Sequence, residues 1–168
     1  MDTIKGMQLT AQDIMKRGVR CVTLDMTMSD LERALIRDEV SGFPVVHEGK
    51  LVGIVSRSDV VRQLCVEQSV AEVVSDYYRD STGFAPTRAQ SLHRISEMVG
   101  ESIEHKCVKD FMVHQLITVA PTQPVEEVAS LLVRNHIHRV PVVEDGRLLG
   151  IITTLDLVRL IAEGRTQG

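Results

Sequence analysis

The stretch SGFPVVHEGKLVGIVSRSD, residues 41–59, returns later in the chain as HRVPVVEDGRLLGIITTLD, residues 138–156. The two copies align without a gap, and 8 of the 19 positions carry the same residue. Average composition would give about one identity in a stretch of this length. At the same offset upstream, the tripeptide DIM at 13–15 matches DFM at 110–112. The chain is therefore built from one duplicated unit.

Each copy opens with a short β-rich piece, 22–24 or 117–119, and continues into an amphipathic helix. The apolar residues of both helices have the i, i+3, i+4 spacing of one buried face. They are Leu31, Ala34 and Leu35 in the first copy and Val128, Leu131 and Leu132 in the second. For the first helix we expect Thr27 or Ser29 as the N-cap, with Glu32 closing a capping box on Ser29.

Two apolar runs follow in each copy, separated by Glu-Gly at 48–49 or Asp-Gly at 145–146, which are tight-turn dipeptides. Each pair of runs is predicted to form a β-hairpin. Pro44 and Pro141 lack a backbone N–H, which favours a strand edge or a bulge at these positions. A second helix is predicted to start at the Ser-x-x-Asp or Thr-x-x-Asp phrase that ends each stretch. The predicted unit is β-α-β-β-α, and the predicted fold class is α/β.

Residues 65–106 have no counterpart and separate the two predicted domains, 8–64 and 107–163. A continued helical pattern after the first copy and an amphipathic stretch at 87–106 predict a helical insertion. The turn-rich RDSTGFAPT at 79–87 is expected to break it.

The composition is that of an ordinary globular protein, with 43% apolar and 25% charged residues among 168. The net charge of −4 comes from interspersed signs, so we expect no nucleic-acid partner. No apolar stretch reaches the roughly 20 residues that a membrane span needs, and the chain begins without a signal-peptide core. Cys21, Cys65 and Cys107 are isolated, which is typical of reduced thiols. We therefore expect a cytoplasmic protein.

The duplicated motif (F/V)PVV…G(K/R)L(V/L)GI(V/I)(S/T)xxD resembles that of cystathionine β-synthase (CBS) domains, and residues 10–64 and 107–162 resemble a tandem CBS pair. The resemblance implies two repeats packed with pseudo-two-fold symmetry, a Bateman-type module, with two clefts between them. In this family the clefts commonly bind adenosine-containing ligands such as AMP, ADP, ATP or S-adenosylmethionine. Such pairs commonly form disc-shaped homodimers, and many regulate an enzyme, a channel or a transporter.

The repeated phrase offers a possible site for a ribose phosphate. A helix starts just after Ser56 or Thr153, and the first backbone N–H groups of a helix attract anions. A hydroxyl at this place adds a hydrogen bond to a phosphate. Asp59 and Asp156, three residues on, each have two acceptor oxygens that suit the adjacent hydroxyls of a ribose. Ile54, before the first phrase, is a candidate apolar face for a base.

The same phrase also has an interpretation that needs no ligand. Ser-x-x-Asp is the spacing of a capping box, and an aspartate in the first turn stabilises a helix by itself. The two roles are compatible, because Ser56 can cap the helix while the site is empty.

The second copy carries an additional basic stretch. Arg139, a planar and permanently charged group, is expected with His138 to contact phosphate, and a surface ion pair is its alternative role. On one strand, His136 and His138 would point the same way, as metal ligands do. No second cluster of His or Cys lies near them in the sequence, so we expect no metal. Ser41 and Gly42 stand in the first copy where His138 and Arg139 stand in the second, which argues against equal occupancy of the two clefts.

No GxSxG, HExxH, Walker A or Rossmann glycine pattern is present, so we expect no catalytic residue, no enzyme activity and no cofactor. We expect a homodimeric sensor that binds an adenine nucleotide or S-adenosylmethionine. Because the sequence ends soon after the second copy, its signal is expected to act on a separate protein. The alternative is a ligand-independent dimerisation or docking module. In the arrangement that the family implies, the cleft of Asp59 faces Arg139, so both should matter more for binding than Asp156.

Overall fold

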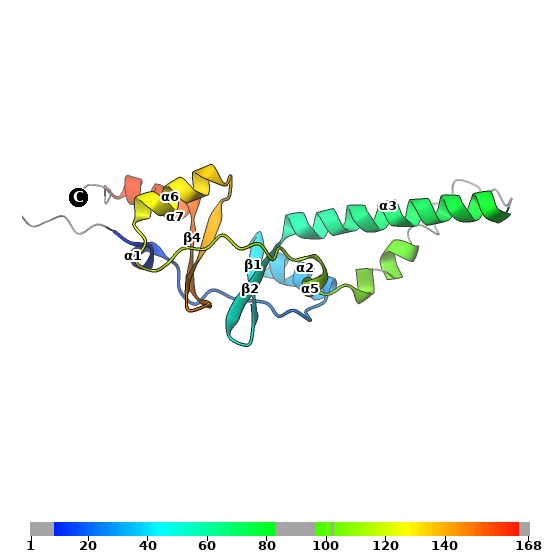
Figure 1. The fold of residues 1–168 in the computed structure, drawn as a ribbon, viewed down its shortest axis with the longest axis horizontal. Coiled ribbons are helices and arrows are strands. Elements are labelled where there is room, and N and C mark those ends of the chain that lie inside the picture. The colour runs from blue at the N-terminus through cyan, green and yellow to red at the C-terminus, as the bar shows by residue number, and fades with distance from the viewer. Residues whose placement is uncertain (1–8, 83–96, 102, 165–168) are drawn as a thin grey trace, which may run out of the picture. The chain divides into compact units, whose positions relative to one another are not determined.

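Figure 1 shows the computed structural model of the chain, which describes residues 9–82, 97–101 and 103–164. In chain order the elements are α1 (Ala11–Ile14), α2 (Met28–Arg37), β1 (Gly42–His47), β2 (Lys50–Ser56), α3 (Arg57–Thr82), α5 (Val108–Phe111), α6 (Val125–Arg134), β3 (Arg139–Glu144), β4 (Arg147–Thr153) and α7 (Thr154–Ala162). This order confirms the predicted α/β class and the duplicated helix–hairpin–helix pattern.

The chain divides into two compact units. Residues 1–21, 47–52 and 115–168 form one, here called the Asp156 unit, and residues 22–46 and 53–114 form the other, here called the Asp59 unit. The Asp156 unit contains the hairpin and helices of the second copy, and the Asp59 unit contains most of those of the first.

Each unit takes a leading segment from the other copy of the repeat. In the Asp156 unit, α1 is followed by Lys16, whose backbone exchanges hydrogen bonds of 2.9 and 3.0 Å with Ile151 of β4. In the Asp59 unit, α5 is followed by Val113, which exchanges bonds of 2.9 and 3.1 Å with Ile54 of β2. Sequence alignment makes Lys16 and Val113 equivalent, but it does not tell on which copy each segment packs.

Both predicted hairpins are confirmed, with two-residue loops between β1 and β2 and between β3 and β4. All four loop residues have positive φ: 49° at Glu48, 76° at Gly49, 51° at Asp145 and 80° at Gly146. Positive φ at both loop positions is the type I′ geometry, which matches the twist of the paired strands. The Glu-Gly and Asp-Gly dipeptides therefore fix the register of both hairpins.

The prolines lie where the missing N–H is not needed. The β-rich piece at 117–119 contributes one parallel bridge, in which Val119 N donates to Pro141 O at 3.0 Å and Val143 N donates to Val119 O at 2.9 Å. Pro141 takes part in this bridge only as an acceptor, through its carbonyl. The register shift of the hairpin follows it, between Val142 and Val143. Pro44 is used in the same way by Val22. Each first strand of the predicted β-α-β-β-α unit is thus reduced to a single bridge.

The predicted helix faces form the cores. Leu31, Ala34 and Leu35 are buried on α2, and Val128 and Leu132 are buried on α6. In the Asp156 unit, where α6 and α7 lie beside the β3–β4 hairpin (Figure 1), the core also contains residues of the leading segment. Its buried members are Ala11, Met15, Val119, Val128, Leu132, Val140, Val142 and Ile152, with Leu131 partly buried against them. Each fully buried aliphatic side chain contributes about 1.5–3 kcal/mol.

The N-cap of α2 is Thr27, whose hydroxyl accepts from Asp30 N at 3.2 Å and lies 3.0 Å from an Asp30 carboxylate oxygen. The alternative capping box between Ser29 and Glu32 is wrong, because the helix begins one residue before Ser29, at Met28. An aspartate three residues after the cap replaces the expected glutamate.

The helical character predicted for the insertion is confirmed where the structure describes it. Helix α3 runs without interruption to Thr82, and residues 97–101 and 103–105 are also helical. The expected break at 79–87 is therefore wrong for its first four residues, and the rest of it lies outside the described residues. Among the described residues, no helix combines the length and the apolar character required to cross a lipid bilayer.

Candidate functional site

In the Asp156 unit, the repeated phrase forms a reciprocal cap at the start of α7. Thr153 N and Thr153 Oγ1 both donate to Oδ2 of Asp156, at 2.8 and 2.6 Å. Asp156 N donates back to Thr153 Oγ1 at 3.3 Å. The carboxylate is 7% exposed, yet its second oxygen is not part of the cap. The interpretation of the phrase as a capping box is therefore confirmed at the start of α7.

The second carboxylate oxygen of Asp156 is held by a cation from the leading segment. Lys16 Nζ lies 3.1 Å from Oδ1, and the Lys16 side chain is 55% exposed. Burial raises the pKa of Asp156, but the bonds from Thr153 and the Lys16 ammonium lower it more, so the net direction is downward. The carboxylate is thus ionised and fixed in orientation at neutral pH.

Two further predicted site residues lie at the same end of the hairpin. Arg139, the first residue of β3, is paired directly with Thr153 of β4. It is half-buried, and this burial lowers the pKa of its guanidinium from the usual value. His138 is exposed and accepts from Thr154 N through its backbone carbonyl at 3.0 Å. The structure therefore brings His138, Arg139, Thr153 and Asp156 together within one unit.

In the Asp59 unit, the hydroxyl residue donates the same two bonds to the aspartate, and the cation is different. Ser56 N and Ser56 Oγ donate to Oδ2 of Asp59 at 2.9 and 2.6 Å. Oδ1 of Asp59 accepts from Arg62 Nη1 at 2.9 Å, from the next turn of the same helix. Asp59 is 5% exposed, whereas the Arg62 side chain is 66% exposed. Ile54 is half-buried beside this phrase, where its backbone pairs with Val113.

The residues that replace the basic pair in the first copy have a structural explanation. Ser41 accepts from Arg57 N at 3.0 Å, as His138 does from Thr154 in the other unit. A Cβ on Gly42 would lie 2.7 Å from the carbonyl oxygen of Val55, so a side chain at this position requires a backbone shift. An arginine equivalent to Arg139 therefore does not fit the first copy as it is built.

Lys16, like Arg62, is a site residue that sequence reasoning did not identify. The alignment of DIM at 13–15 with DFM at 110–112 makes Lys16 equivalent to Val113, so the difference in charge was visible. The contact between Lys16 and Asp156 could not be predicted from the alignment, because it follows only from the exchange of leading segments.

The histidine pair does not have the geometry of a metal site. His136 has φ of 53° in the turn after α6, and His138 precedes β3, so the two do not share a strand. The described part of the chain contains no group of three or more His, Cys, Asp or Glu residues placed to hold a metal ion.

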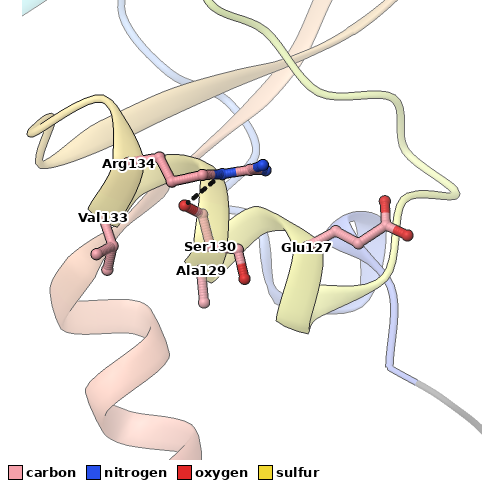
Figure 2. A pocket seen from close by; sticks show the side chains of 5 residues that line it. All are labelled: Glu127, Ala129, Ser130, Val133 and Arg134. Carbon is pink, nitrogen blue, oxygen red and sulfur yellow. Dashed lines mark hydrogen bonds between the residues drawn. The ribbon is translucent and has the colours of Figure 1, made fainter.

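An open hollow lies along α6 (Figure 2). It is lined by Glu127, Ala129, Ser130, Val133 and Arg134, and Arg134 Nε donates to Ser130 O at 3.3 Å. All five residues come from one helix, so the hollow is a feature of the helix surface.

Comparison with known proteins agrees with this geometry. A sequence profile described as CBS domain matches residues 11–65 and 108–163. The chain is 31% identical over 160 residues to Uncharacterized protein MJ1426 of Methanocaldococcus jannaschii, and the match covers 94% of each chain. Other curated relatives are longer, and the chain spans 42% of one and 63% of another.

Two solved structures share the fold. CBSX2 in complex with AMP matches with a TM-score of 0.66 and 23% identity, over 93% of this chain and 98% of that chain. The CBS domain pair of protein MJ0100 in complex with 5′-methylthioadenosine and S-adenosyl-L-methionine matches with a TM-score of 0.61 and 22% identity, over 94% of this chain and 98% of that chain.

Proposed function

The chain belongs to the CBS domain family, and on this premise we propose that it is a regulatory module that binds an adenosine-containing ligand through its two hydroxyl–aspartate phrases. Pairs of CBS domains are generally regulatory modules, and we propose no catalytic role for this one. Ligand binding would signal to a partner protein by favouring one of two conformations, which requires a different affinity for each.

One observation carries the proposal: each buried aspartate has one oxygen fixed by the helix cap and a second oxygen paired with an exposed cation. Oδ2 of Asp156 and of Asp59 is fixed by the cap, and Oδ1 is held by Lys16 in one unit and Arg62 in the other. The cation is largely solvated, so it loses little hydration in the pair and gains it back when it leaves, and two ribose hydroxyls can donate to the carboxylate in its place. A ribose diol can therefore replace the cation at little cost, and the cap keeps the carboxylate in place.

The complexes of the two structural relatives support the choice of ligand. CBSX2 was solved with AMP, and the MJ0100 domain pair with 5′-methylthioadenosine and S-adenosyl-L-methionine. These ligands share an adenosine group and differ in what is attached at its 5′ position. We therefore propose an adenine nucleotide or S-adenosylmethionine for this chain.

A thermal-shift screen against AMP, ADP, ATP, S-adenosylmethionine and NAD tests the proposal. A ligand at 100 times its Kd adds about 2.7 kcal/mol, and a protein of this size shifts by roughly 2–4 °C per kcal/mol. We expect an upward shift of several degrees with at least one adenosine ligand. If none of them shifts the transition at millimolar concentration, the sensor proposal is wrong. Release of phosphate from ATP would contradict the absence of catalysis.

We also propose that the chain forms a homodimer through helix faces that both repeats keep apolar. Ile36 on α2 and Val133 on α6 are equivalent positions, and they are 65% and 74% exposed. On the second helices, Val61 is equivalent to Val158, and all these side chains are exposed. A second copy of the chain offers the same faces, as a two-fold interface requires.

Sedimentation at micromolar concentration tests the dimer. We expect twice the mass of the chain, and a lower mass after Ile36→Ser or Val133→Ser. Leu155→Ser is the matched control, because Leu155 is an exposed apolar residue whose equivalent in the first copy is Ser58. A wild-type monomer refutes this part of the proposal. A dimer that binds none of the ligands would favour the ligand-independent docking module.

A further inference from the structure

In both sites a hydroxyl residue donates two bonds to the aspartate, but the cations come from different segments. Asp156 is paired with Lys16, which enters from the leading segment, and Asp59 is paired with Arg62 of its own helix. Arg159 stands in the second copy where Arg62 stands in the first, so both copies have the helix arginine. Lys16 is therefore an additional cation of the Asp156 unit, and Val113 occupies its place in the Asp59 unit.

The position of Lys16 is set by its backbone. Lys16 N donates to Ile151 O at 2.9 Å, and Ile151 N donates to Lys16 O at 3.0 Å, which ties the residue to β4 two positions before Thr153. Its side chain is flexible and more than half exposed. When the ammonium leaves Asp156, it therefore stays near the start of α7, beside the strand pair of Arg139 and Thr153.

We propose that Lys16 makes the Asp156 site selective for an adenosine ligand that carries phosphate. This inference rests on the proposed binding function and deepens it. Without ligand, the ammonium neutralises Asp156. When the two ribose hydroxyls donate to the carboxylate, they take over the role of Lys16, and the released ammonium binds a phosphate oxygen of the same ligand. Adenosine, which has the ribose but no phosphate, makes the first exchange and leaves Lys16 without an anionic partner.

The Asp59 unit lacks this exchange at the corresponding position, because Val113 has no charge to offer. A charge-assisted hydrogen bond to phosphate is worth about a ten- to hundred-fold change in affinity. The preference for a phosphorylated ligand should therefore depend on Lys16, and a lysine placed at position 113 should introduce a similar preference in the first copy.

Titration calorimetry with AMP and adenosine on the full chain tests the inference, because these ligands differ only in the phosphate. For wild type we expect AMP to bind at least ten-fold more tightly. Lys16→Val should weaken AMP about ten-fold or more and change adenosine affinity less than three-fold, by the bond strength above. Lys16→Arg should restore the preference. Lys109→Val is the control for loss of a surface lysine: Lys109 is 52% exposed, against 55% for Lys16, and lies 3.2 Å from Asp25, which is itself exposed.

The outcomes separate this inference from the proposed function. If wild type prefers AMP and Lys16→Val keeps the same ratio of affinities, Lys16 is not the selective residue, while the sensor proposal stands. Equal affinity of wild type for AMP and adenosine also overturns the inference. If wild type binds neither ligand, nor ADP, ATP, S-adenosylmethionine or NAD, both proposals are wrong. Far-UV circular dichroism of each variant identifies any loss of fold.

Discussion

Replacing Asp156 by alanine should cost far more stability than the same change at Asp13, although both aspartates accept the same two bonds from a threonine. Thr10 N and Thr10 Oγ1 donate to Asp13 Oδ2 at 2.8 and 2.6 Å, as Thr153 does to Asp156. The bonds of Asp13 are exposed, whereas those of Asp156 are partly buried. Asp156 is also paired with Lys16, but that lysine is 55% exposed. The comparison therefore tests mainly the effect of burial on one kind of helix cap.

The expected losses of stability depend on whether the donors that lose the carboxylate can bond to water instead. In Asp156→Ala, the Thr153 N–H and hydroxyl lose a charged acceptor in a place that water reaches poorly, and such an unsatisfied group costs about 1–3 kcal/mol. With the weaker helix start, we expect a total of about 2–3 kcal/mol. In Asp13→Ala, water replaces the carboxylate, and the cost should be about 0.5–1 kcal/mol, the low end for a cap.

Urea unfolding followed by far-UV circular dichroism measures both costs. With a slope of about 2 kcal/mol per molar urea, Asp156→Ala should lower the midpoint by about 1–1.5 M and Asp13→Ala by about 0.25–0.5 M. Asp156→Asn keeps an acceptor oxygen and should fall between wild type and Asp156→Ala. Equal midpoint shifts for the two alanine variants would refute the argument from burial.

Three further predictions follow from the site and the hairpins. The pKa of Asp156 is lower in the folded state than in the unfolded chain. The ionised carboxylate therefore stabilises the fold fully above about pH 4, and this contribution is lost as the pH falls through the folded-state pKa. The urea midpoints of wild type and Asp156→Asn should accordingly converge in strong acid. Gly150→Ala would put a Cβ 2.6 Å from a backbone carbonyl, and Gly53→Ala would put one 2.6 Å from a methionine sulfur, so the first should lower the thermal midpoint more. Asp59→Ala and Arg139→Ala should each weaken binding of an adenosine ligand at least ten-fold in titration calorimetry, the loss of one charge-assisted bond.

Most of the fold could be predicted from the sequence because its signals are local. The tight-turn dipeptides fix the hairpins, and the apolar spacing of Leu31, Ala34 and Leu35 marks the face that is buried. The choice of Thr27 over Ser29 as N-cap could not be made, because both patterns are acceptable and only the real helix start decides. The packing of the leading segments could not be predicted for another reason. Their packing partners are far away in sequence, and the alignment is the same whether they are exchanged or not.

The candidate site shows the same division between local and distant information. The bonds from Thr153 to Asp156 lie within three residues, and the phrase alone predicts them. The cation on Asp156 comes from a residue that precedes it by almost the whole chain, and no pattern in the sequence joins the two. The expectation that Asp156 matters less than Asp59 depended on Ser41 and Gly42 having no charge, unless Arg57 or another basic side chain compensates. Lys16, 3.1 Å from Asp156, is such a side chain. The ranking of the two aspartates therefore depends on the ligand: a phosphorylated one uses Lys16 at Asp156, and an uncharged one does not.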